Sequence, residues 1–350
     1  MPRLSFFTSF SKQPILADNP IWQQPIPLRL DTLRKGDDVS VRHADYFKAA
    51  QAFLEARNHD VITRAASQRL GYAVKPHDLA EIRIRLEKHG AFYHPARVEI
   101  IVGQKQLSFV LNVAISDSGR RFIEQDYHHL KRLNAETPFD YLPAVYGCEQ
   151  ITGPAGLNFG MFLGEWFEGY HEFHLAPDPA DKTVKIIVWD DSSGRFFLTA
   201  AQTKSLYAQA ARILTCYYNV VSFEQILAWH HAAGDFVVHF ESDRIRLKLV
   251  TVRRYAAIFE NQKQTKADAN DPQRLLQGAG GSMDITDQAD FYRHHKPRSG
   301  GDFADRRQVD GEFVFAVDFE QCIHLLLVIG GNRAGAGTDC GTRQIEVLTE

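Results

Sequence analysis

The residues that decide the fold are 97–113, which read RVEIIVGQKQLSFVLNV. Two β-rich runs, Val98 to Val102 and Leu107 to Val113, flank the turn Gly103-Gln104-Lys105-Gln106. Alternation with period two indicates strands, and a short turn containing glycine indicates that the strands pair as an antiparallel hairpin. Residues 120–134 then have a helical pattern, so the sequence predicts a hairpin with a helix packed against its sheet.

Further elements are predicted after this helix, as far as Tyr255. They are strands at 145–151, 159–166 and 184–189, a helix from about 199 to 211 or 218, and strands at 236–240 and 245–252. A Gly-Asp turn precedes the last two strands. Residues 261–311 are polar and glycine-rich without periodicity, which predicts a mobile segment, and strand character returns at 312–329.

The residues before the hairpin have a different character. Residues 1–40 contain several prolines and predict an extended arm over the folded body, whereas 43–70 have helical spacing and end at Gly71. Asp78 is then predicted to cap a further helix. The apolar side of that helix would be Leu79, Ile82 and Leu86. Residues 1–95 are therefore interpreted as an arm followed by a helical extension.

Composition places the chain among ordinary globular proteins. It is 44% hydrophobic and 24% charged, and its net charge of −3 does not favour nucleic acid or an acidic membrane surface. No apolar run of about 18 residues is present, and the first ten residues lack the apolar core of a signal peptide. We therefore expect a cytoplasmic protein without a membrane partner. The cysteines, which form no C-x-x-C pair and are expected to be reduced thiols, are Cys148, Cys216, Cys322 and Cys340.

The order of elements from Arg97 to Tyr255 resembles that of the kinase-like fold. Hairpin, helix, two strands, helix, Gly-Asp turn and two strands are most similar to the aminoglycoside phosphotransferase and choline kinase branch. The resemblance implies an α/β (α+β) protein with a two-lobed protein-kinase-like fold and an N-terminal helical extension. The implied domains are the extension at 1–95, a β-rich lobe at 96–165, a helical lobe at 166–260 and a loosely ordered C-terminal region at 261–350.

Two positions resemble the part of the family that holds nucleotide phosphates. In the family a strand lysine contacts the phosphates, and here the motif VLNV puts Asn112 at that position. The family's next helix carries an acidic residue, which Asp126 matches through its spacing to Leu130 and Leu133, with Glu124 as the alternative. An amide at residue 112 cannot supply the positive charge that phosphoryl transfer uses.

The segment from Phe162 to Gly169, FLGEWFEG, resembles the hinge that lines the adenine pocket of the family. Backbone groups bind adenine there, so changes of side chain would not abolish binding. The resemblance therefore implies that Glu165, Trp166 and Phe167 are cofactor-binding residues.

Gly234-Asp235 resembles the catalytic H-G-D turn, whose aspartate accepts the proton of the substrate hydroxyl. However, Ala233 replaces the histidine, and Phe240 stands where the family has a metal-binding asparagine. Thr251 stands at the position of the metal-binding aspartate, and a threonine is at most a weak ligand of Mg²⁺.

Because the family's lysine, asparagine and aspartate are all replaced, the sequence predicts a catalytically degenerate kinase-like domain with a nucleotide-linked binding or regulatory role. Its partner would be a nucleotide or a protein, and ATP and Mg²⁺ are the candidate cofactors. The first alternative is an active, atypical ATP-dependent phosphotransferase with Asp235 as its base.

A second alternative is a winged-helix DNA-binding regulator. Three helices followed by a hairpin, over residues 44–102, is also the order of that domain. The basic side chains that would contact phosphates are Arg64, Arg69, Lys75, Arg83, Arg85 and Lys88. Acidic residues interrupt this patch, so nucleic acid is the less favoured partner.

Other constellations are weaker. His171 and His174 have a spacing that could hold a metal if the segment were helical, but no third ligand is apparent. Asp190-Asp191 is interpreted as a turn, and Arg253-Arg254 as a solvated basic pair. The glycine-rich residues 278–281 lack the lysine of a phosphate-binding loop. No metal site is predicted.

Overall fold

The computed structural model describes residues 2–9, 11–16, 18–26, 41–90, 92–153, 156–190, 194–227, 229, 234–241 and 244–257. The chain divides into two units, Met1–Ala176 with Ile186–Pro297, and Pro177–Lys185 with Arg298–Glu350. The predictions for residues 261–350, including the strands at 312–329, lie outside the described residues.

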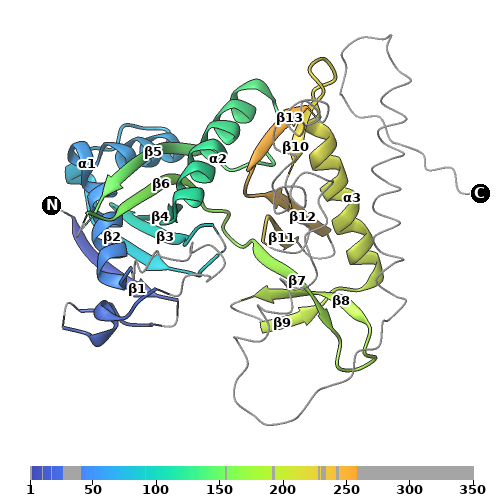
Figure 1. The fold of residues 1–350 in the computed structure, drawn as a ribbon, viewed down its shortest axis with the longest axis horizontal. Coiled ribbons are helices and arrows are strands. Elements are labelled where there is room, and N and C mark those ends of the chain that lie inside the picture. Colours follow the sequence, from blue (N-terminus) through green and yellow to red (C-terminus); the bar gives the residue numbers. More distant parts are fainter. Residues whose placement is uncertain are drawn as a thin grey trace, which may run out of the picture. The chain divides into compact units, whose positions relative to one another are not determined.

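A six-stranded sheet forms the first half of the fold, in the order β1-β2-β3-β4-β6-β5 (Figure 1). Its strands are β1 (Arg3–Thr8), β2 (Leu79–Leu86), β3 (Ala96–Val102), β4 (Lys105–Ala114), β5 (Val145–Thr152) and β6 (Asn158–Glu165). The predicted hairpin is confirmed, because β3 and β4 are antiparallel with Val98 opposite Phe109. Gly103 takes a φ of 60° in the turn, a conformation that favours glycine.

Two helices cover opposite faces of this sheet. Strand β4 alternates, so Phe109 and Leu111 belong to the core that contains α1 (His43–Leu70), whereas Ala114 belongs to the core that contains α2 (Asp117–Glu136). The same holds on β6, where Phe162 faces α2. The predicted placement of a helix against the hairpin sheet is therefore confirmed.

Helix α1 begins and ends where the sequence predicts, and Gly71 closes it with a φ of 75°. It is broken at Ala56–His59, where Arg57, Asn58 and His59 all have positive φ. The two predicted helical runs on either side of this break both pack into the core.

The prediction of a helix after Asp78 was wrong. Residues 79–86 form strand β2, in which buried Ile82, Ile84 and Leu86 alternate with Arg83 and Arg85. The helical interpretation counted the apolar spacing of three and four residues and overlooked Ile84, which sets the period to two. Asp78 instead ends a short 3₁₀ turn, η2 (Pro76–Asp78), and accepts a hydrogen bond from the Lys75 amide at 2.8 Å.

The N-terminal block is consequently not a separate helical extension. Strand β2 pairs with β3, and β1 adds to β2 in parallel at the edge, so the predicted arm is extended but belongs to the sheet. A second short 3₁₀ turn, η1 (Pro20–Gln23), follows β1. The third helix of the winged-helix order is strand β2, which removes the observation behind that alternative.

A second sheet has the order β12-β11-β7-β8-β9. Its strands are β7 (His171–Pro177), β8 (Val184–Asp190), β9 (Gly194–Phe197), β11 (Phe236–Glu241) and β12 (Arg244–Leu249). A small antiparallel pair joins β10 (Glu224–Leu227) to β13 (Arg254–Ala257). Helix α3 (Ala200–Cys216) begins where the sequence predicts, with Thr199 as its N-cap. It supports β12 through Gln209, whose side chain forms hydrogen bonds with the backbone of Ile245 and Leu247.

Within the described residues of the expected helical lobe, 166–260, α3 is the one helix and the rest of the regular structure is strands. Strands β7 and β9 were not predicted, because polar and apolar residues are mixed in both. The structure is therefore α+β. Among the described residues, no helix combines the length and the apolar character needed to cross a membrane.

Close packing between α1 and the edge strand β5 gives a first prediction. A Cβ at Gly147 would lie 2.7 Å from Cγ2 of buried Val61. We expect Gly147→Ala to lower the free energy of unfolding by about 1–3 kcal/mol in urea denaturation. Adding Val61→Ala relieves the overlap, so the double variant should lose less than the sum of both single losses. Additive losses would contradict this packing.

Candidate functional site

The predicted residues Asp126 and Thr251 come together in the interior. Asp126 lies on α2 and is 1% exposed. The Thr251 hydroxyl donates to Asp126 Oδ2 at 2.8 Å, and the Val252 amide donates to Oδ1 at 2.6 Å. Both carboxylate oxygens of Asp126 are thus occupied by donors from the segment after β12.

Burial governs the charge of this carboxyl group. It raises the pKa of Asp126 to about 6, against the lowering effect of the Val252 and Thr251 hydrogen bonds. The positive charge of Arg253 lowers this pKa further, whereas the negative charge of Asp235 raises it. The four residues Asp126, Thr251, Asp235 and Arg253 therefore act on one another, and we call them the acid cluster.

Asp235, the predicted base, is held by Arg253. Asp235 is 1% exposed and pairs through both oxygens with the guanidinium, with Arg253 Nη1 at 2.8 Å from Oδ2. This is the geometry of a bidentate, charge-assisted pair. Although burial opposes its charge, Asp235 raises the pKa of Arg253.

The interpretation of Arg253 as solvated was wrong, since its side chain is only 22% exposed. The sequence does not indicate that, of the neighbouring Arg253 and Arg254, Arg253 is the one that pairs with buried Asp235. Its partner Asp235 is 18 residues away in the sequence, and it lies there because β11 and β12 form a hairpin. Arg253 also lies over the ring of Phe92, 5.7 Å from its centroid.

A second charged pair, Glu172 with Lys88, lies beside the turn at Gly234. Gly234 has a φ of 79°, and a Cβ there would lie 3.2 Å from Glu172 Oε1. Glu172, on β7, forms an ion pair with Lys88 from the segment between β2 and β3. A glycine is favoured at the turn because other residues rarely adopt this backbone conformation, and a Cβ would also crowd the Glu172 carboxylate. Ala233, the residue before this turn, lies outside the described residues.

Asn112 is not among the residues that hold Asp126. Strand alternation puts it on the α2 face of β4, opposite Phe162 of β6. Its side chain takes no part in the hydrogen bonds that hold Asp126. Phe240, at the family's asparagine position, lies on β11 and packs on the ring of Phe196.

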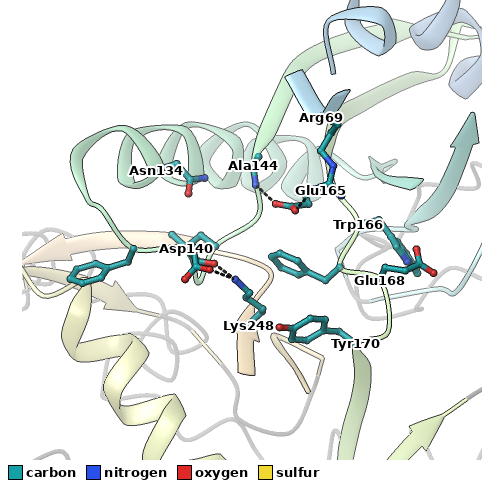
Figure 2. A pocket seen from close by; sticks show the side chains of 12 residues that line it. Arg69, Asn134, Asp140, Ala144, Glu165, Trp166, Glu168, Tyr170 and Lys248 are labelled. Carbon is teal, nitrogen blue, oxygen red and sulfur yellow. Dashed lines mark hydrogen bonds and ion pairs between the residues drawn. The ribbon is translucent and has the colours of Figure 1, made fainter. Parts of the chain in front are cut away.

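The predicted hinge residues line a separate pocket of about 460 Å³ (Figure 2). We call it the linker pocket. Its lining residues are Arg69, Asn134, Phe139, Asp140, Leu142, Ala144, Glu165, Trp166, Phe167, Glu168, Tyr170 and Lys248. Pockets of about 300–1,000 Å³ are typical of small-molecule sites.

Polar groups in the linker pocket are paired with one another. Glu165 accepts from the Ala144 amide at 3.2 Å and pairs with Arg69 at 2.5 Å. Figure 2 shows Lys248 and Asp140 directed at each other beside Tyr170, and their ion pair measures 3.1 Å. Lys248 also lies 5.4 Å from the centroid of the Phe167 ring. The pocket therefore combines aromatic walls with charges that hold its shape.

Six of the predicted site residues thus fall into two groups, and Asn112 belongs to neither. Asp126, Asp235 and Thr251 belong to the acid cluster, whereas Glu165, Trp166 and Phe167 line the linker pocket. The acid cluster and the linker pocket share no residue. The sequence missed Arg253, Lys88 and Glu172, none of which belongs to the motifs of the resemblance.

The histidine pair does not form a metal site. His171 and His174 lie on strand β7, where a spacing of three residues puts side chains on opposite faces. Their nearest acidic partners are different, Asp190 at 3.9 Å and Glu172 at 3.7 Å. The described part of the chain contains no group of three or more His, Cys, Asp or Glu residues that could hold a metal ion. Asp191 and residues 278–281 lie outside it.

Comparison with known proteins adds no assignment, since no family model and no curated protein matches this chain.

Proposed function

We propose that residues 79–257 form a kinase-like domain that binds a nucleotide and does not transfer its phosphate. The strand order supports the resemblance. Strands β2, β3, β4, β6 and β5 are consecutive neighbours in an antiparallel sheet, and α2 lies between β4 and β5 in the chain. The linker that follows β6 lines the linker pocket, which supports a ligand-binding role for this segment.

The proposal that this domain does not transfer phosphate rests on one observation, the partners of its acidic side chains. Phosphoryl transfer requires acidic side chains that are able to hold Mg²⁺ and to accept the proton of the substrate hydroxyl. Here both oxygens of Asp235 pair with Arg253, and Thr251, at the position of the metal-binding aspartate, donates its hydroxyl to Asp126. A guanidinium beside the two acids supplies internally the positive charge that a bound metal would bring.

An active phosphotransferase is the alternative. A comparison of ATP binding and turnover with Mg²⁺ and with EDTA distinguishes the two. We expect calorimetry on the full chain to show ATP binding of similar affinity with Mg²⁺ and with EDTA, because Arg253 already neutralises Asp235. ATP turnover should be absent, and Asp235→Asn should leave that result unchanged.

Two outcomes would contradict this proposal. Mg²⁺-dependent turnover that is lost in Asp235→Asn would establish the active enzyme. If neither ATP nor adenosine binds, the nucleotide-linked role is wrong.

A further inference from the structure

The described residues between β2 and β3, 87–90 and 92–95, form a loop that is held by hydrogen bonds. The Glu87 amide donates to the Pro95 carbonyl at 3.0 Å, and the Gly90 amide donates to the Tyr93 carbonyl at 2.9 Å. The Tyr46 hydroxyl of α1 donates to the His94 carbonyl at 2.7 Å, and the His94 amide donates to Val113 of β4. We call residues 87–90 and 92–95 the β2–β3 loop. Its end is thus fixed to α1 and to the sheet.

The β2–β3 loop lies against α2 and the acid cluster. Phe92 packs edge-on against Phe122 of α2, with centroids 4.9 Å apart, and its other partner is the Arg253 guanidinium. A Cβ at Gly119, in the first turn of α2, would lie 2.8 Å from the Phe92 carbonyl oxygen. The helix therefore approaches the loop backbone closely only because residue 119 is glycine.

This placement brings Lys88 to the turn that carries Asp235. Lys88 pairs with Glu172, and the Glu172 carboxylate lies 3.2 Å from the position of a Cβ on Gly234. Desolvation lowers the pKa of Lys88 to about 8, Asp235 opposes this lowering and Arg253 adds to it, so the amine keeps its charge at neutral pH. Its side chain is 46% exposed, against 26% for Glu172, 22% for Arg253 and 1% for Asp235, so Lys88 is the most exposed of these four charged groups.

We infer that Lys88 supplies the positive charge that contacts the phosphates of a bound nucleotide, because Asn112 stands where the family has its lysine and carries no charge. This inference rests on the proposed function. A nucleotide carries more negative charge than the Glu172 carboxylate. Its phosphates therefore replace Glu172 as the partner of Lys88 when the nucleotide binds. Asn112, from the strand position that the resemblance assigned to a lysine, offers only an amide dipole.

The test uses ATP and inorganic tripolyphosphate as probes, with EDTA present, in calorimetry on the full chain. Lys88→Gln should weaken ATP and tripolyphosphate by about tenfold or more, because one charge-assisted contact is lost. Adenosine should bind as it does to the wild type. Lys88→Arg should restore most of the affinity, and Glu172→Gln should raise the affinity for both anions by freeing Lys88.

Lys105→Gln is the matched control, since Lys105 is a lysine of the other hairpin turn and lies 5.4 Å from the Tyr72 ring. It should bind both probes as the wild type does. If Lys88→Gln binds ATP like the wild type, or if Glu172→Gln lowers the affinity, Lys88 does not hold the phosphates, although nucleotide binding stands. If the wild type binds neither ATP nor adenosine, the proposed function and this inference are both wrong.

Discussion

Replacing Arg253 by alanine is expected to lower the free energy of unfolding by about 3–5 kcal/mol. The substitution leaves the Asp235 carboxylate, which is 1% exposed, without the guanidinium that pairs with both of its oxygens. A buried, ionised carboxylate that loses a charged partner is among the most costly groups in a folded protein. Urea denaturation at neutral pH, with the full chain, measures the change.

Arg64 offers a matched control for this experiment. It pairs with Asp60 at 3.1 Å, but the two side chains are 59% and 41% exposed. Exposed pairs contribute about 0–1 kcal/mol, so Arg64→Ala should change the free energy of unfolding by less than about 1 kcal/mol. Equal effects of the two substitutions would mean that the Arg253–Asp235 pair is solvated, and the observation behind the loss of catalysis would be gone.

The parts of the fold that the sequence predicts correctly are those with one clear period. Val98 to Val102 and Leu107 to Val113 alternate on both sides of a short turn, and no helical pattern competes there. Strand β2 was harder, because Leu79, Ile82 and Leu86 fit one helical face while Ile82, Ile84 and Leu86 fit one strand face. Ile84 favours the strand, and the pairing of β2 with both β1 and β3 stabilises it.

The candidate site was predictable only where its residues belong to motifs of the resemblance. Asp126 and Thr251 were chosen from motif spacing, and their hydrogen bond joins residues 125 positions apart. Lys88 and Arg253 were counted as surface charges, because charged residues are mostly exposed and the sequence gives no reason to treat either one differently. Their roles depend on the approach of the β2–β3 loop to the turn at Gly234, which is a property of the tertiary structure.

The stability of the protein is expected to fall as the pH rises from about 4 to about 7, through Asp126. The ordinary pKa of this group, 3.8, applies to the unfolded chain, and burial raises the folded value to about 6. Between these values the folded chain holds a proton that the unfolded chain has released. The stabilising effect of that proton is complete below the unfolded pKa and is lost as the pH rises through the folded pKa, and it amounts to about 3 kcal/mol at most.

Asp126→Asn isolates this contribution, because an amide has no charge to titrate and its oxygen still accepts the Val252 hydrogen bond. Urea denaturation of both proteins between about pH 4 and pH 7 should show the variant gaining stability relative to the wild type as the pH rises. Glu81→Gln is the control of opposite sign. The Arg83 hydrogen bond lowers the pKa of Glu81 to about 2, so this substitution should alter the pH dependence only on the acidic side of the range. If the wild type and Asp126→Asn keep a constant difference across the range, Asp126 does not take up a proton on folding, and the acid cluster is more hydrated than its hydrogen bonds to Thr251 and Val252 indicate.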